Sequence, residues 1–315
     1  MKNGISQPCK AFPLSLKSHK TMNPFANSQT NRLLGYPPDT RLLIINADDF
    51  GMCHAVNEAI IGTLKKGIVR STTVMVPCPW ALHAMHFLAR HPEIAFGVHL
   101  TVISDWVDYR WGPVTPREKV PSLINQAGYF YDFAHMPEFL AQVNLDQLEM
   151  EFRRQIEIVL SAGLKPTHLD WHSLRISDRS DILELMLRLA KEYGLALRVA
   201  GRSWIEKVQS QGLPTNDYDF LDSYHLDPVT KAARYAELLR ELPVGLSEWA
   251  VHPGLDNSEL SAIEPDGNHI RQTDFDFLTS QQAEDVLKEE GIILLDYRVL
   301  QNVWKEKVNS QENTL

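Results

Sequence analysis

Short apolar runs alternate with amphipathic segments along most of the chain, and this alternation restricts the fold more than any other feature. The first run, 42–45, is continuously apolar, as expected for a strand buried on both faces. Helical periodicity follows over 53–66 and ends at Gly67. Strands are predicted over 42–45, 71–76, 96–102, 167–171, 196–200, 247–251 and 292–295. Helices are predicted over 53–66, 79–90, 137–161, 180–193, 228–242 and 280–290.

Strands that alternate with helices form parallel βαβ units. The pattern therefore predicts an α/β fold, an irregular (βα) TIM-barrel-like domain with mostly parallel strands; an open doubly wound sheet is the alternative. No GxGxxG motif follows the first strand, which weakens a dinucleotide-binding interpretation. We expect an N-terminal tail over 1–40, either partly disordered or packed on the domain, a barrel over 41–300, and a C-terminal tail over 301–315.

Composition excludes several classes of function. The 315 residues suit one barrel, and 31 basic against 40 acidic residues disfavour a nucleic-acid partner. The three cysteines form no CxxC pair, which argues against a disulfide framework and a thiolate zinc site. No apolar segment is long enough for a membrane span or a signal peptide. We therefore expect a cytoplasmic protein without a membrane partner, and a homodimer is left open.

Two long segments, 103–136 and 202–227, interrupt the alternation and are rich in aromatic residues. Loops of this length in compact domains are often functional. Their aromatic side chains could stack on sugar rings at a barrel mouth, or they could pack on the barrel as local cores. The sequence favours the two interpretations equally.

Polar residues collect where predicted strands end. The C-terminal ends of parallel strands converge on one face of such folds, and that face holds the site. Side chains from distant parts of the chain should therefore meet there. These residues are Asp48, Asp49, His99, His168, Asp170, His172 and His252.

The residue types in these clusters favour a metal site. Adjacent carboxylates such as Asp48 and Asp49 repel each other unless a cation or a shared proton lies near, although one could instead cap the next helix. His99 alone is more typical of a core histidine. Imidazole and carboxylate ligands suit a divalent ion with open coordination positions. Such an ion activates water and polarises a carbonyl, and a further carboxylate can act as general base.

Five motifs in this order resemble the YdjC/ChbG family of carbohydrate deacetylases, over a range from about Leu42 to about Leu300. The motifs are NADDFG at 46–51, GIVRSTT at 67–73, GVHLT at 97–101, PTHLDWH at 166–172 and VHP at 251–253. The resemblance implies a barrel-like fold and the hydrolysis of N-acetyl groups on a small carbohydrate substrate. It also implies one divalent ion, magnesium or zinc, bound by Asp49, His99 and His172.

The same resemblance implies roles for residues beside the metal. Asp48 would be the general base for the attacking water, and His252 a general acid for the leaving amine. Arg198 would pair with Asp48 and keep it ionised. His168 and Asp170 would lie behind the ligands, with Asp170 orienting an imidazole.

One departure from the family pattern follows His172. Many family members continue with two further histidines at alternate positions, whereas this chain reads Ser173-Leu174-Arg175. The ligand set is intact, so the departure concerns the substrate. The resemblance therefore implies an N-acetylated amino sugar or a related compound, without naming chito-oligosaccharides.

Two other functions fit parts of the pattern. His168-x-Asp170 with a distant His252 matches the two-His-one-carboxylate spacing of non-haem iron oxygenases. Those enzymes usually use antiparallel jelly rolls, which the strand–helix alternation does not support. The second alternative is a non-catalytic barrel that binds a sugar.

Overall fold

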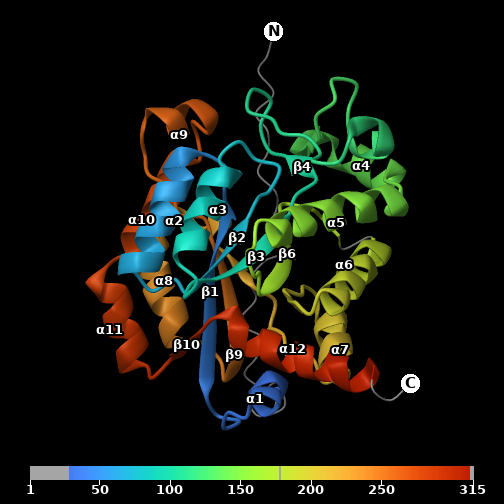
Figure 1. Cartoon of the computed structure of the whole chain (residues 1–315). Helices are drawn as coiled ribbons and strands as arrows, with labels where there is room; N and C mark the ends of the chain where they lie inside the picture. Colours follow the sequence, from blue (N-terminus) through green and yellow to red (C-terminus); the bar gives the residue numbers. More distant parts are fainter. Residues whose placement is uncertain (1–27, 177–178, 313–315) are drawn as a thin grey trace.

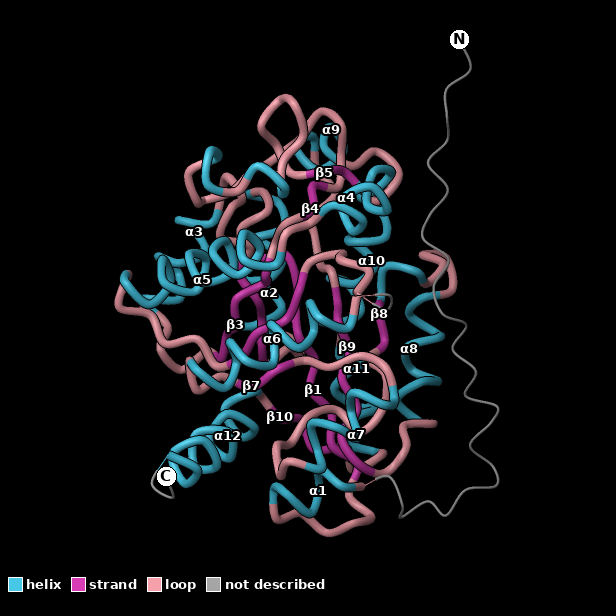
Figure 2. The backbone as a smooth tube through the Cα atoms, turned by 90° about the vertical axis from the view of Figure 1, so that its right-hand side faces the viewer, coloured by secondary structure: helices cyan, strands magenta, loops and turns pink. Residues whose placement is uncertain are grey.

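A curved parallel sheet runs through the centre of the molecule, with helices around it (Figures 1 and 2). The structure, a computed structural model, describes residues 28–176 and 179–312. All pairings in the eight-stranded sheet are parallel. Its strands are β1 (Arg41–Phe50), β2 (Ser71–Val74), β3 (Ala95–Leu100), β6 (His168–Trp171), β7 (Ala196–Leu197), β8 (Leu221–Asp222), β9 (Gly245–Val251) and β10 (Ile293–Leu295).

The strand order is β7-β6-β3-β2-β1-β9-β8, and β10 pairs with the beginning of β1. Strands that are neighbours in the sheet are also successive strands of this sheet along the chain, from β1 through β2, β3 and β6 to β7 and from β8 to β9. The pairing of β9 with β1 joins the late strands to the first one, as in a barrel. A doubly wound sheet would instead reverse its order at a switch point. The irregular barrel-like prediction is confirmed, and within the described residues the barrel is open between β7 and β8.

Asn216 and Asp217 lie in the open gap between β7 and the first part of β9, where the short strand β8 does not reach. The Asn216 side chain accepts from the Val199 amide N–H at 3.2 Å and donates to the Val199 carbonyl at 2.8 Å. The next residue, Asp217, donates its amide N–H to the Leu246 carbonyl on β9. Because Asn216 makes the two bonds that a neighbouring strand would make, it partly replaces a missing strand pairing.

Helices cover the outside of the sheet. They include α2 (His54–Lys66), α3 (Ala81–Arg90), α5 (Leu145–Ser161), α6 (Ser180–Glu192), α8 (Lys231–Arg240), α10 (Asn268–Leu278) and α11 (Gln281–Glu289). The prediction of one helix over 137–161 was wrong. The segment forms α4 (Met136–Gln142) and α5, because Asn144 begins a new helix by accepting the Gln147 amide N–H on its side chain. In the described part of the chain, no helix is long and apolar enough to cross a membrane.

Both ends of the described chain pack on the barrel. Helix α1 (Gln29–Leu34) lies within the expected tail 1–40, and its Thr30 amide donates to Asp217. Residues 1–27 of that tail lie outside the described residues. Helix α12 (Tyr297–Glu312) continues through the expected boundary at 300, and its fully buried Trp304 donates to the Pro214 carbonyl. The packed unit therefore extends beyond 41–300 at both ends.

The two long interruptions contain short elements. The first holds β4 (Ile103–Ser104) and β5 (Tyr131–Asp132), and the second holds α7 (Arg202–Ser210), β8 and a 3-10 turn (Ser223–His225). Segments with β4, α4 and α9 (Ser258–Ile263) lie beyond the C-terminal ends of the strands, at the top of Figures 1 and 2. Trp111 is buried among aromatic neighbours, so this residue packs as part of a local core.

Candidate metal centre

A bulge at the end of β1 presents Asp48 and Asp49 together. Ala47 pairs with Thr72 and Phe50 with Val74, so β1 carries one more residue than β2 between these pairs. Side chains alternate in a regular strand, and two adjacent carboxylates would then face opposite ways. Asp49 adopts φ of 71°, a left-handed conformation that is uncommon outside glycine. The irregular backbone allows both aspartates to serve one site.

His99 is positioned by the pairing of β3 with β6. His99 and Asp170 are direct partners in this parallel register, and His99 Nδ1 lies 2.7 Å from Asp170 Oδ1. Thr73 on β2 donates to the other Asp170 oxygen at 3.0 Å. The sheet thus holds Asp170 so that His99 Nε2 faces Asp49, as expected for a carboxylate that orients a ligand imidazole.

His172 follows β6 directly, and its amide N–H donates to the Leu100 carbonyl. Its Nδ1 lies 3.2 Å from Asp49 Oδ1, and its Nε2 lies 2.9 Å from Asp105 in the loop after β4. The next residue, Ser173, has φ of 52°, so the strand turns away immediately behind the imidazole. Asp105 was not among the residues proposed from sequence.

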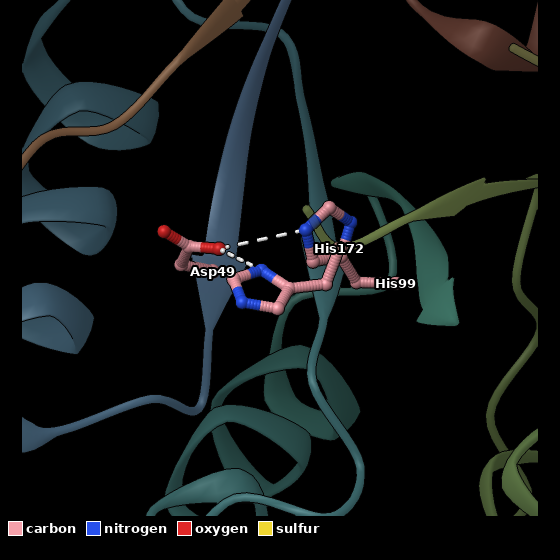
Figure 3. Close-up of side chains that lie close together, drawn as sticks. All are labelled: Asp49, His99 and His172. Carbon is pink, nitrogen blue, oxygen red and sulfur yellow. Dashed lines mark hydrogen bonds and ion pairs between the residues drawn. The ribbon is translucent and has the colours of Figure 1, made fainter. Parts of the chain in front are cut away.

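The three proposed ligands converge at one point (Figure 3). Asp49 Oδ1 lies 3.4 Å from His99 Nε2 and 3.2 Å from His172 Nδ1, and one ligand atom from each residue falls within 4.8 Å of the others. All three residues are 3% exposed or less. Two imidazoles and one carboxylate at this separation match the donor set of an open divalent-metal site.

The electrostatics also favour a cation at this point. Burial works to lower the pKa of both imidazoles, but facing carboxylates outweigh it. Asp170 is the main cause that raises the pKa of His99 to about 10, and Asp105 is the main cause that raises the pKa of His172 to about 9. Carboxylates that raise the pKa of an imidazole also stabilise other positive charge at the same place. The residues therefore fit a divalent ion.

Asp49 also has a buried cationic partner that the sequence did not reveal. Burial alone would raise the pKa of Asp49, but Arg271 on α10 lies 2.9 Å from Asp49 Oδ2 and holds that pKa well below its usual range. Arg271 Nε donates to Glu264 at 2.7 Å, and its guanidinium lies over the Tyr224 ring. No motif around residue 271 indicates this role.

Asp48 is bound on both oxygens by Arg198, as the family resemblance implied. The two nitrogen–oxygen distances are 2.7 and 2.9 Å, and Asn46 donates to the same carboxylate at 2.7 Å. Burial opposes ionisation, but the charge and hydrogen bonds of Arg198 hold the pKa of Asp48 well below its usual range. Arg198 also contacts Asp170 at 2.9 Å and Glu248 at 2.7 Å.

His252 lies just beyond the end of β9, on the same face of the sheet. Its Nδ1 is 3.1 Å from Ser223 Oγ, and its amide N–H donates to Asp274 at 2.7 Å. His252 Nδ1 also lies 3.6 Å from Asp222 Oδ1.

His168 lies in a different environment from the other histidines. Its ring stacks on Tyr297 at 3.6 Å between centroids, and its Nδ1 contacts Thr167 at 2.9 Å. Burial holds the pKa of His168 well below its usual range, so the ring is neutral. Within residues 28–176 and 179–312 it makes no hydrogen bond to Asp49, His99 or His172, so it packs behind the site without orienting a ligand.

A second group of metal-binding residue types, His54, Glu58 and His83, lies on the surface of α2 and α3. Asn57 donates its side-chain N–H to His83 Nδ1 at 3.0 Å, while its carbonyl oxygen accepts the Gly51 amide N–H. His83 must therefore carry its neutral-form proton on Nε2, the nitrogen nearest Glu58. This arrangement disfavours a metal at His83.

Comparison with known proteins places the chain in a family. The model of the family described as YdjC-like protein matches residues 42–289. The chain belongs to the YdjC-like family. The resemblance inferred from the motifs is thereby confirmed, and the matched range contains Asp49, His99 and His172, the residues of the candidate metal centre.

Relatives of this YdjC-like chain cover most of its length. A carbohydrate deacetylase from Enterococcus faecalis is 35% identical over 82% of this chain and 97% of its own length. A chitooligosaccharide deacetylase from Serratia marcescens is 26% identical over 82% of this chain and 99% of its own. A solved structure of a candidate cellobiose-phosphate cleavage protein from Enterococcus faecalis V583 superposes with a TM-score of 0.70 at 32% identity, covering 83% and 99% of the two chains.

Proposed function

We propose that this protein is a metal-dependent carbohydrate deacetylase that hydrolyses the amide bond of an N-acetylated amino sugar or a related compound. The observation that carries the proposal is the convergence of Asp49, His99 and His172 beside a second, separately held carboxylate, Asp48. The relatives named as carbohydrate deacetylases support the reaction class. Hydrolysis converts the acetamide and water into a free amine and acetate.

Asp49, His99 and His172 would hold the ion. When bound, a divalent ion supplies a Lewis acid that polarises the acetamide carbonyl and lowers the pKa of water. Two imidazole donors suit zinc and similar ions better than magnesium, which prefers oxygen ligands. We therefore expect zinc to bind more tightly than magnesium.

Asp48 is the proposed general base. Arg198 keeps the carboxylate ionised and fixes its orientation, so that it can accept a proton from the attacking water, although the same pairing makes it a weaker base. His252 is the proposed general acid, and it would protonate the nitrogen of the leaving amine. Ser223 and Asp274 fix its ring and its backbone.

The structure does not support the iron-oxygenase alternative, which would need His168, Asp170 and His252 as metal ligands. His168 is stacked on Tyr297, while Asp170 is bound to His99 and Arg198. His168, Asp170 and His252 therefore do not converge as three ligands within the described residues. The parallel sheet also differs from the jelly roll that such enzymes usually adopt.

The first test compares metal content and acetate release for the wild type and a His99→Ala/His172→Ala variant. We expect about one divalent ion per wild-type chain and none in the variant. Acetate should be released from N-acetylated mono- or oligosaccharides by the metal-loaded wild type alone. Metal binding without acetate from any N-acetyl sugar would favour a sugar-binding barrel. Failure of the wild type to bind excess zinc or magnesium would overturn the proposal.

A further inference from the structure

The two proposed imidazole ligands are supported by carboxylates of different origin. Asp170, which contacts His99 Nδ1, lies in the sheet and is fully buried between Thr73 and Arg198. Asp105, which contacts His172 Nε2, lies outside the sheet, and 15% of its side chain is exposed. Each carboxylate binds the imidazole nitrogen that faces away from Asp49.

The loop that carries Asp105 is fixed by hydrogen bonds to two other segments, one before the loop and one after β1. We define the cap loop as residues 105–111. Its Trp111 donates the indole N–H to the Ile103 carbonyl at 2.8 Å, and its ring lies 5.8 Å from the His172 ring. Tyr109 donates its hydroxyl to the Met52 carbonyl at 2.6 Å, close in sequence to Asp49. These contacts hold the cap loop beside the site at two residues other than Asp105.

We propose that Asp105 is a positioning residue that holds His172 with its Nδ1 toward the metal, and that it thereby links the cap loop to metal binding. This inference rests on the proposed function, because it concerns the same metal centre. An acceptor on Nε2 fixes the proton there and leaves Nδ1 as the nitrogen free to bind a metal. Without Asp105, His172 loses the contact that selects this orientation.

The expected effect is on metal affinity. Removing a carboxylate that supports a ligand imidazole typically weakens metal binding by roughly 10- to 100-fold. Asp105→Asn keeps an oxygen acceptor but loses the charge, so its effect should lie near the lower end of that range. Asp105→Ala removes both and should lie near the upper end. Asp108→Asn, at an exposed position in the same loop, is the matched control and should bind as the wild type does.

The experiment measures zinc affinity by competition with a chromogenic chelator, for the wild type and these three variants. Circular dichroism checks that each variant is folded. Nitrogen-15 NMR of the histidine side chains in the zinc-loaded wild type then identifies the metal-bound nitrogen of His172, which we expect to be Nδ1. Unchanged zinc affinity in both Asp105 variants, or zinc on His172 Nε2, would overturn the inference. Either result would leave the deacetylase proposal intact, since acetate release by the wild type is measured separately.

Discussion

Two series of hydrogen-bonded side chains support Asp48 and Asp49, and in both the order of residue types is Asp–Arg–Glu–Tyr. One runs from Asp48 through Arg198 and Glu248 to Tyr297. The other runs from Asp49 through Arg271 and Glu264 to Tyr224. In each, the arginine Nε contacts the glutamate at 2.7 Å, and the tyrosine hydroxyl donates to that glutamate.

The two series differ in the number of aspartate oxygens that the arginine contacts. Arg198 contacts both oxygens of Asp48, and Asn46 adds a further donor, so this carboxylate is surrounded by protein groups. Arg271 contacts only Oδ2 of Asp49 and leaves Oδ1 facing His99 and His172. The same four residue types thus produce one carboxylate held by the protein and one with an oxygen available to a metal. This difference favours Asp49, and not Asp48, as the metal ligand.

Exchange of each aspartate for asparagine is the strongest test of this difference. For Asp48→Asn we expect kcat to fall by roughly 10²- to 10⁴-fold, because a general base is lost, while zinc remains bound. For Asp49→Asn we expect zinc to be lost, because a charged ligand is removed. Metal analysis together with acetate release distinguishes the two results.

Circular dichroism is the control for correct folding of both variants. Loss of zinc from Asp48→Asn would make Asp48 a ligand and contradict the division of roles. Retention of zinc by Asp49→Asn at wild-type affinity would contradict it equally.

Replacement of Arg198 or Arg271 should lower the free energy of unfolding, and zinc should offset this loss to a different extent in the two variants. Arg198→Met and Arg271→Met each leave buried carboxylates without their partner, which typically costs roughly 3–5 kcal/mol. Zinc bound at Asp49 would replace part of the charge lost with Arg271, but it has no equivalent effect on Asp48. Urea denaturation with EDTA and with excess zinc measures the free energy of unfolding in both states. Zinc should raise this free energy more for Arg271→Met than for the wild type, and Arg198→Met should show no such extra gain.

The gain in stability of the wild type on zinc addition is the reference for both arginine variants. An equal recovery of Arg198→Met and Arg271→Met by zinc would show that the two arginines do not serve different carboxylates. No recovery of either variant would contradict the position of Arg271 beside the metal.

Much of the barrel and the centre of the site could be predicted from the sequence. Parallel strands bring their C-terminal ends together, so Asp49, His99 and His172 could be placed on one face from the strand pattern and the motifs. Among the described residues, one strand of the main sheet escaped prediction: β8 has only Leu221 and Asp222, with no apolar run to indicate it. Likewise, the break between α4 and α5 depends on one capping residue, Asn144.

The supporting residues were harder to predict because their partners are remote in the chain. Arg271 lies on an amphipathic helix, where a single arginine resembles a solvated side chain, and Glu264 has no local pattern either. Asp105 lies in a segment for which only aromatic content was informative. Each contact arises from tertiary packing of distant segments, which strand and helix periodicity does not encode.

A third buried carboxylate, Asp217, extends the comparison because it has no ion pair within the described residues. It accepts N–H groups of Leu246, Thr30 and Gln209, and through Thr30 it fixes helix α1 to the barrel. Burial is the main influence, and it raises the pKa of Asp217 from 3.8 to about 6 despite these donors. In Asp48 and Asp49, by contrast, an arginine reverses the effect of burial.

The pH dependence of the free energy of unfolding should reveal the raised pKa of Asp217. Of the three tests proposed, this one is expected to give the smallest effect. A carboxyl whose pKa is higher in the folded state favours folding when protonated, so its contribution is present at low pH and is lost as pH rises from about 4 to about 6. The loss is at most about 3 kcal/mol. Urea denaturation of the wild type and Asp217→Asn across this range should show that loss in the wild type only. If the difference between the two proteins is independent of pH, then the donors from Leu246, Thr30 and Gln209 fully offset the effect of burial on the ionised carboxylate, and the expected rise in the pKa of Asp217 is wrong.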